Sequence, residues 1–281
     1  MRYTINDIKE MKLKGQRISM LTAYDYPTSK LLDQAGIPII LVGDSLAQVV
    51  LGYESTVRVT MDEMLHHTRA VVRGTQHALI IGDMPFMSYQ TDVSTAIRNA
   101  GRFLQEAGAQ AVKLEGGERM ADTVRNIVEC GIPVMGHIGL TPQSVYQLGG
   151  YKVQGKTPKA AAQLLRDAVA LQEAGAFSIV LEGVPTPLSR IITQKLAIPT
   201  IGIGAGVECD GQIQVLPDMV GMFTDFTPKH AKRYANLAEV YKEAAARFMQ
   251  EVQERTFPTA KESFTMDESA LAALAELAKS L

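Results

Sequence analysis

This chain of 281 residues has no tryptophan and only two cysteines, and neither positive nor negative charge is in large excess. The two cysteines, Cys130 and Cys209, lie far apart in unrelated contexts. We therefore expect two reduced thiols of a cytoplasmic protein instead of a disulfide framework. The 28 basic and 30 acidic residues give a net charge of −2 without a dense block of lysine and arginine. This balance argues against nucleic acid as a partner.

Long apolar segments are also missing. The first ten residues, Met1 to Glu10, lack the apolar centre of a signal peptide. The apolar runs elsewhere are too short and too often interrupted to span a bilayer. We therefore expect a cytoplasmic protein with no membrane partner.

What the sequence does contain is a recurring unit, in which a short apolar, β-branched run is followed by a longer stretch with helical periodicity. The runs are almost continuously apolar, which is typical of parallel strands covered on both faces. They predict strands over residues 18–24, 37–42, 78–81, 111–114, 134–136, 178–181, 200–203 and 219–223.

The stretches between these runs predict helices. Thr60 and Glu63 form a capping box before the helix over 64–73. Further helices are expected from near Thr4 and over 91–107, 118–130, 157–174 and 228–252, with another from about Asp267. A glycine lies just past several helix ends, where it permits the left-handed cap conformation: Gly36, Gly108, Gly131 and Gly175.

Eight strands alternating with helices favour an α/β fold, a (β/α)8 TIM barrel with an N-terminal helix and an extra C-terminal helix. An open, doubly wound sheet is the main alternative. We expect residues 1–281 to form a single barrel domain, with a C-terminal tail helix from about residue 257.

Five consecutive predicted strands end in an ionisable residue at the same relative place: Asp44 (followed by Ser45), Asp83, Glu115, His137 and Glu182. The carboxyl ends of barrel strands form the rim on which active sites are built. Each residue alone also fits a loop residue that caps the next helix. The series favours a site, because an ionised side chain beside a buried run is costly unless it is paired or ligated.

Lys113 and Glu115 are two residues apart on one strand and therefore point to the same side. The helix layer is apolar, so we expect both side chains at the mouth of the barrel. Three carboxylates from adjacent strands, Asp44, Asp83 and Glu115, suit a hard divalent cation such as Mg²⁺. Zinc fits less well, because the cluster has no cysteine and offers at most His137.

Taken with their surroundings, these residues closely resemble the ketopantoate hydroxymethyltransferase (3-methyl-2-oxobutanoate hydroxymethyltransferase) family over about residues 2–255. The resemblance rests on the blocks MLTAYDYP from Met20, VGDSL from Val42, LGY from Leu51, TMDEM from Thr60, GDMPF from Gly82, VKLEGG from Val112, GHIGLTPQ from Gly136, GYKVQG from Gly150, LEGVP from Leu181 and GIGAG from Gly202.

The resemblance implies a barrel enzyme of pantothenate and coenzyme A biosynthesis. The family transfers a hydroxymethyl group from 5,10-methylenetetrahydrofolate to 3-methyl-2-oxobutanoate, giving 2-dehydropantoate through a Mg-stabilised enolate, and it assembles as a homodecamer. Carried over by position, Asp44, Asp83 and Glu115 hold one Mg²⁺ per subunit, directly or through water. Asp44, Ser45, Asp83, Lys113 and His137 bind substrate, and Glu182 is the catalytic base.

This chemistry agrees with the residue types. The proton to be removed lies on the carbon beside a ketone, and a carboxylate base needs the resulting enolate to be stabilised. A chelated divalent ion provides that stabilisation as a Lewis acid, and Lys113 adds positive charge. The loop between Thr141 and Thr157 is a candidate lid against water. Two alternatives stay open: a lyase or mutase of the phosphoenolpyruvate and isocitrate lyase type, and a non-catalytic binding barrel.

Overall fold

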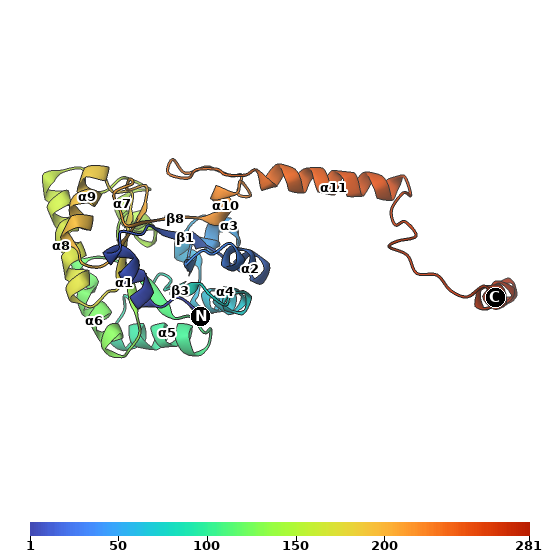
Figure 1. The fold of residues 1–281 in the computed structure, drawn as a ribbon, viewed down its shortest axis with the longest axis horizontal. Helices are drawn as coiled ribbons and strands as arrows, with labels where there is room; N and C mark the ends of the chain where they lie inside the picture. The colour runs from blue at the N-terminus through green and yellow to red at the C-terminus, as the bar shows by residue number, and fades with distance from the viewer. The chain divides into compact units, whose positions relative to one another are not determined.

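The computed structural model describes residues 1–281 and contains a closed barrel of eight parallel strands (Figure 1). Each strand pairs with the next along the chain, and the last pairs with the first. This confirms the predicted (β/α)8 barrel and excludes the open sheet. The strands are β1 (Ile18–Thr22), β2 (Ile39–Val42), β3 (Leu79–Asp83), β4 (Ala111–Glu115), β5 (Val134–Gly139), β6 (Ser178–Glu182), β7 (Thr200–Ile203) and β8 (Gly211–Gln214).

Helices surround this barrel on its outer side (Figure 1). The capping box is present, since the Thr60 hydroxyl accepts from the Glu63 amide and the Glu63 carboxylate accepts from the Thr60 amide. The helices of the barrel region are α1 (Ile5–Leu13), α2 (Tyr26–Gln34), α3 (Leu46–Val49), α4 (Met61–Gly74), α5 (Val93–Gln105), α6 (Ala121–Glu129), α7 (Val145–Leu148), α8 (Pro158–Glu173), α9 (Thr186–Lys195) and α10 (Leu216–Met219). Short 3-10 turns cover Thr56–Arg58, Glu118–Met120 and Pro142–Ser144.

The prediction of the eighth strand was wrong. Residues 219–223 form no strand, and the barrel closes through β8 at residues 211–214, where Gly211 pairs with Ile18. The run of β8 is half polar, because Gln212 lies exposed on its outer face. A search for continuously apolar runs therefore passes over it. The short helix α10, which has a proline in its first turn, follows β8 and ends at Met219, the first residue of the predicted strand.

Alternation along the strands separates an inner from an outer layer of the core. Every second residue of β1 to β8, such as Met20, Leu41 and Ile81, joins one buried cluster, which also contains Ile8 of α1. The intervening residues, such as Ile40, join a second cluster with the surrounding helices. The first set thus fills the barrel interior, and α1 covers it at one end. The same alternation places Asp83, Lys113, Glu115, His137 and Glu182 above this inner layer.

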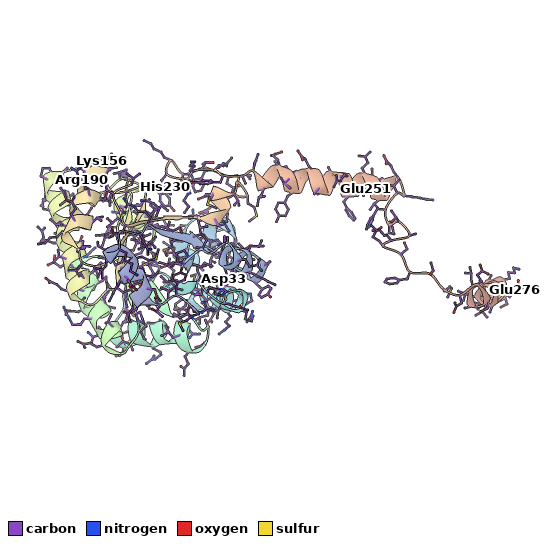
Figure 2. All side chains as sticks on the ribbon, in the orientation of Figure 1. Asp33, Lys156, Arg190, His230, Glu251 and Glu276 are labelled. Carbon is purple, nitrogen blue, oxygen red and sulfur yellow. The ribbon has the colours of Figure 1, made fainter.

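A buried carboxylate in α2 holds this helix to the start of β3, at the same end of the barrel as α1. Asp33 (Figure 2) accepts hydrogen bonds from the backbone amides of Gln76, His77 and Ala78 at 2.9, 2.9 and 2.7 Å, just before β3 begins. Burial acts to raise the pKa of Asp33, but these backbone hydrogen bonds outweigh it and lower the pKa to about 2. The interaction is structural, and it gives His77 a partner at 3.0 Å that the sequence did not suggest.

The chain divides into two compact units, residues 1–234 and 235–281. The second contains α11 (Leu237–Gln253) and α12 (Glu268–Ser280). The helix expected over 228–252 therefore begins later than predicted, whereas the helix expected from about Asp267 is confirmed. The single-domain assignment stays a prediction. Cys130 and Cys209 are free thiols, as expected. No helix is long and apolar enough to cross a membrane.

The glycines that follow helices provide a test of the local sequence signals. Gly36, Gly108, Gly131 and Gly175 all adopt φ between +78° and +95°, which confirms their predicted role. A methyl group added at Gly131 would meet no atom within 4 Å, and the same holds for Gly101 inside α5. The two sites differ in backbone conformation, because only Gly131 has a positive φ.

We predict that Gly131→Ala lowers the free energy of unfolding by about 1–2 kcal/mol, the cost of a side chain in the left-handed region. Gly101→Ala, the matched control, raises it by about 0.5–1 kcal/mol, because alanine favours the helix interior. Urea unfolding midpoints measure both. Equal effects of the two substitutions would show that the backbone at Gly131 is not held in this conformation.

Candidate active site

One cavity of about 730 Å³ opens at the carboxyl ends of the strands, and all seven predicted site residues line it. Asp44 and Ser45 lie just after β2, beyond Gly43, and Asp83 ends β3. Lys113 and Glu115 lie within β4, His137 within β5, and Glu182 ends β6. Four of the five ionisable strand ends are thus part of the strands themselves. Strand register sets Asp83 beside Lys113 and Glu115 beside His137.

The central interaction of the cavity is a buried ion pair. The Lys113 ammonium donates to both carboxylate oxygens of Asp83 at 2.8 Å, and both side chains are at most 5% exposed. The Asp44 amide donates to the same carboxylate at 3.1 Å. Burial acts to lower the pKa of Lys113, but the charges of Asp83, Asp44 and Glu115 together raise it above its ordinary value. Lys113 is therefore a permanent cation of this site.

Gln143, which sequence reasoning missed, joins two of the carboxylates. Its side-chain amide donates to Asp44 at 2.9 Å, and its backbone amide donates to Glu115 at 3.0 Å. Its side-chain oxygen accepts from the Tyr89 hydroxyl at 2.7 Å. A neutral amide in a polar loop carries no signal of such a role in the sequence. Gln143 ties the loop after β5 to the acidic cluster.

Negative charge exceeds positive charge in this cluster. Burial, together with the nearby charge of Asp83, raises the pKa of Asp44 to about 7. Burial and the charge of Asp44 raise the pKa of Glu115 well above its ordinary value. One Glu115 oxygen is buried and has no hydrogen-bond partner. Three carboxylates share a single ammonium, so an added cation would be stabilised here.

No group of three or more His, Cys, Asp or Glu side chains already stands in a ligating arrangement. Asp83 is paired with Lys113, and Asp44 and Glu115 each accept a hydrogen bond from Gln143. The oxygen donor set nevertheless fits a hard cation that keeps much of its water and takes only one or two carboxylates directly. The predicted assignment of Asp44, Asp83 and Glu115 as metal ligands stays a prediction.

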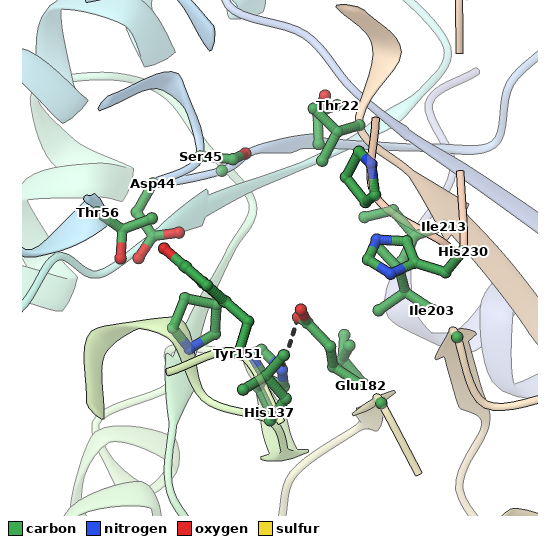
Figure 3. Close-up of a pocket in the computed structure, with 18 of the residues that line it drawn as sticks. Thr22, Asp44, Ser45, Thr56, His137, Tyr151, Glu182, Ile203, Ile213 and His230 are labelled. Carbon is green, nitrogen blue, oxygen red and sulfur yellow. Dashed lines mark ion pairs between the residues drawn. The ribbon is translucent and has the colours of Figure 1, made fainter. Parts of the chain in front are cut away.

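His137 lies between two carboxylates in the wall of the cavity. Its Nε2 is 3.3 Å from Glu182 (Figure 3). Its Nδ1 is 3.5 Å from Glu115. Neither contact has hydrogen-bond geometry, so both ring nitrogens lack a partner. Burial and the charge of Lys113 lower the pKa of His137. The imidazole is therefore neutral at neutral pH, with one nitrogen available to accept and one to donate.

Ser45 is positioned by a second residue that the sequence reasoning missed. Its hydroxyl is 2.9 Å from the hydroxyl of Tyr24, which follows β1. Burial raises the pKa of Tyr24, which stays a neutral phenol. Tyr24 is the last residue of the first predicted strand, close to the place that the acidic residues take on theirs, and that position was the available signal. The mouth of the cavity is lined by Tyr151, Lys152 and Val153, which belong to the expected lid loop.

A parallel barrel whose strand ends bring carboxylates, an ammonium and an imidazole into one cavity defines an enzyme of small-molecule chemistry. The family model described as ketopantoate hydroxymethyltransferase matches residues 2–260. A protein named 3-methyl-2-oxobutanoate hydroxymethyltransferase from Dehalococcoides mccartyi is 64% identical over 271 residues, covering 96% of this chain and 97% of that protein. A protein of the same name from Clostridium botulinum is 58% identical, covering 96% of this chain and 98% of that protein. Another from Carboxydothermus hydrogenoformans is 59% identical, covering 94% of this chain and 96% of that protein.

The chain therefore belongs to the ketopantoate hydroxymethyltransferase family of pantothenate biosynthesis, and it is a transferase. Among solved structures, a phosphonopyruvate hydrolase has a TM-score of 0.60 at 13% identity, covering 99% of this chain and 97% of that one. A 2,3-dimethylmalate lyase of the PEP mutase/isocitrate lyase superfamily has a TM-score of 0.54 at 16% identity, covering 100% and 97%. These likenesses concern the fold alone, and the family match decides against the lyase or mutase alternative.

The crowded carboxylates make the stability of the metal-free protein depend on pH. Because the folded-state pKa of Asp44 is raised from 3.8 to about 7, the folded state binds more protons than the unfolded state between these values. The contribution of Asp44 to the free energy of unfolding therefore falls as pH rises from about 4 to about 7. Its slope is at most about 1.4 kcal/mol per pH unit for one proton.

We predict that Asp44→Asn gains stability relative to the unsubstituted protein as pH rises through this window. Urea unfolding at several pH values in the presence of a chelator measures the difference. Asp225→Asn, an exposed aspartate outside the cavity, is the control and shows no such trend. If the free energies of unfolding of Asp44→Asn and the unsubstituted protein differ by the same amount from pH 4 to pH 8, the pKa of Asp44 is not raised in the folded state.

Proposed function

We propose that this enzyme transfers a hydroxymethyl group from 5,10-methylenetetrahydrofolate to 3-methyl-2-oxobutanoate, giving 2-dehydropantoate, in the cytoplasm and with Mg²⁺. One observation carries the proposal: the acids, the lysine and the base expected from the sequence line a single cavity. The names of the relatives support the keto acid as acceptor. The direct test is product analysis after the protein is mixed with both substrates and Mg²⁺, where absence of 2-dehydropantoate refutes the proposal.

The acidic cluster supports a divalent cation as cofactor. Asp44, Asp83 and Glu115 would hold it, directly or through water, and the unpartnered oxygen of Glu115 fits this role. A bound divalent cation supplies Lewis-acid stabilisation of the charge that develops on the ketone oxygen. Mn²⁺, Co²⁺ and Ni²⁺ also suit such a donor set.

Lys113 and Ser45 bind the keto acid in this proposal. The Lys113 ammonium is held in place by Asp83 and directs positive charge into the cavity. Ser45 offers a hydroxyl whose orientation depends on Tyr24. Together they orient an anionic substrate that carries a carboxylate and a ketone side by side.

Glu182 acts as the base that removes the proton from C3 of the keto acid. Its carboxylate lies 3.3 Å from the neutral His137, and its side chain is 15% exposed. The C3–H bond breaks, the proton goes to Glu182, and the electron pair forms the new bond from C3 to the methylene carbon. Water supplies the hydroxyl oxygen, and both C–N bonds of the methylene bridge break. One folate nitrogen takes the proton that Glu182 removed and the other takes a proton from the water, so tetrahydrofolate leaves. His137 contacts the substrate beside Glu182.

Water has to be limited during this transfer, and the loop between Thr141 and Thr157 serves as a lid. Tyr151, Lys152 and Val153 of this loop already line the cavity. Gln143 anchors the start of the loop to the acidic cluster. In this proposal the start of the loop stays anchored while its tip moves to close the cavity.

The enzyme is also proposed to work as a homo-oligomer, a decamer by family resemblance. In α12, the side chains of Leu271, Leu274 and Leu277 recur every three residues and are about half exposed. A monomeric protein rarely leaves such a row uncovered. Light scattering of the full chain gives the mass of the assembly, and a monomer would refute this part of the proposal.

We predict that Glu182→Gln lowers the exchange of the C3 proton of 3-methyl-2-oxobutanoate in deuterated water by about 10²–10⁴-fold, the usual contribution of a general base. Affinity for the keto acid stays within a few-fold. Proton NMR follows the exchange. Glu54→Gln, an exposed glutamate outside the cavity, is the control. Undiminished exchange in Glu182→Gln removes this residue as the base.

A second prediction concerns the metal. Asp83→Asn weakens Mg²⁺-dependent binding of the keto acid by about 10- to 100-fold, the usual range for loss of a metal-site partner. Calorimetric titrations with and without Mg²⁺ measure it. The substitution keeps the shape of the side chain beside Lys113. If Mg²⁺ increases keto acid affinity equally in both proteins, Asp83 has no part in the metal site.

A further inference from the structure

The cavity has a second wall, across from the acidic cluster, that the proposed chemistry of the keto acid does not use. Figure 3 shows Ile203, Ile213 and His230 on this side, with Asp44 on the other and Glu182 between them. Ile203 and Ile213 end the inner apolar layer of the barrel. The wall is therefore apolar and adjoins the point where Glu182 reaches the cavity.

A single buried carboxylate lies among the residues of this wall. Asp218 of α10 lines the cavity, is only 6% exposed, and has an oxygen, Oδ1, that is buried without a hydrogen-bond partner. Burial raises the pKa of Asp218, whereas the nearby charges of His230 and Arg233 lower it. An unsatisfied buried acceptor costs about 1–3 kcal/mol, more when it is charged. Such a group requires an explanation, and a ligand with N–H donors provides one.

His230 lies near this carboxylate and close to the backbone of Gly204. Gly204 has φ +62°, and a Cβ atom at that position would lie 3.1 Å from Cβ and 3.5 Å from Cγ of His230. The absence of a side chain at Gly204 thus leaves room for His230. Together with Ile203, Val215 and Phe226, its ring gives the wall flat and apolar surfaces.

We infer that Asp218 is the binding residue for the reduced pterin ring of the one-carbon donor. The inference rests on the proposed function, because it takes the folate as the donor. A pterin presents its ring N3–H and its 2-amino group as two adjacent donors, which a carboxylate accepts side by side as it accepts an arginine fork. The apolar wall then packs against the ring.

The same features argue against the keto acid as the occupant of this wall. 3-Methyl-2-oxobutanoate carries no N–H donor, and its negative charge is repelled by an ionised Asp218. The lysine and the hydroxyl that suit an anion, Lys113 and Ser45, come from β4 and from the end of β2, whereas Asp218 follows β8. One wall therefore suits an anionic keto acid, and the other suits a ring that donates hydrogen bonds. A transfer reaction needs a place for each of these two substrates.

The test compares Asp218→Asn with the unsubstituted full-length protein. We expect the Kd for tetrahydrofolate, measured by calorimetry, to rise about 10- to 100-fold, the effect of losing hydrogen bonds to a charged group. C3 proton exchange of the keto acid, which involves no folate, stays within about twofold. The melting temperature of the ligand-free protein changes little, because no hydrogen bond to the buried Oδ1 is lost and asparagine keeps the shape of the side chain. Asp225→Asn is the matched control.

A comparison of two ligands tests the same contact from the ligand side. An analogue of tetrahydrofolate in which a methyl group replaces the 2-amino group binds the unsubstituted protein about 10-fold or more weakly, and Asp218→Asn no longer distinguishes the two ligands. Equal tetrahydrofolate affinity in both proteins, or an unchanged preference for the amino group in Asp218→Asn, overturns the inference. Failure of the unsubstituted protein to form 2-dehydropantoate from methylenetetrahydrofolate overturns the proposed function instead.

Discussion

The ion pair between Lys113 and Asp83 is the interaction around which the site is built. One ammonium stands among three buried carboxylates, and it neutralises only part of their charge. Burial, together with the remaining negative charge, raises the pKa values of Asp44 and Glu115. A barrel core can tolerate this cluster only because its lower layers are apolar and tightly closed, with α1 at the far end. A functional site of this kind commonly lowers the stability of the folded protein.

The barrel positions these charges through the alternation of its strands. Ala111, Lys113 and Glu115 of β4 point to the same side, so one strand supplies in succession a core residue, the cation and a carboxylate. Met135 and His137 of β5 repeat the arrangement, as do Val180 and Glu182 of β6. The phosphonopyruvate hydrolase and dimethylmalate lyase structures have the same kind of fold at low identity. The reaction is therefore a property of the side chains at the rim and not of the barrel.

The sequence predicted the barrel and the seven rim residues because both depend on local patterns. A charged residue directly after an apolar run is visible in one dimension, and so is a glycine after a helix. The eighth strand was missed because its outer face is polar, which breaks the pattern expected of a covered strand. Gln143 and Asp218 were missed for a different reason. Gln143 acts through hydrogen bonds with five residues far along the chain. The significance of Asp218 lies in an oxygen that has no hydrogen-bond partner.

Calorimetric titration of Mg²⁺ into the full-length protein near pH 6.5, with the keto acid present and in buffers of different ionisation enthalpy, tests the role of the buried charges most directly. Cation binding should favour the ionised carboxylates, so Asp44 and Glu115 release protons as the metal enters. We expect one Mg²⁺ per chain and a net release of protons that diminishes above about pH 8. Absence of Mg²⁺ binding, or binding without proton release at pH 6.5, would contradict a site built from partly neutralised carboxylates.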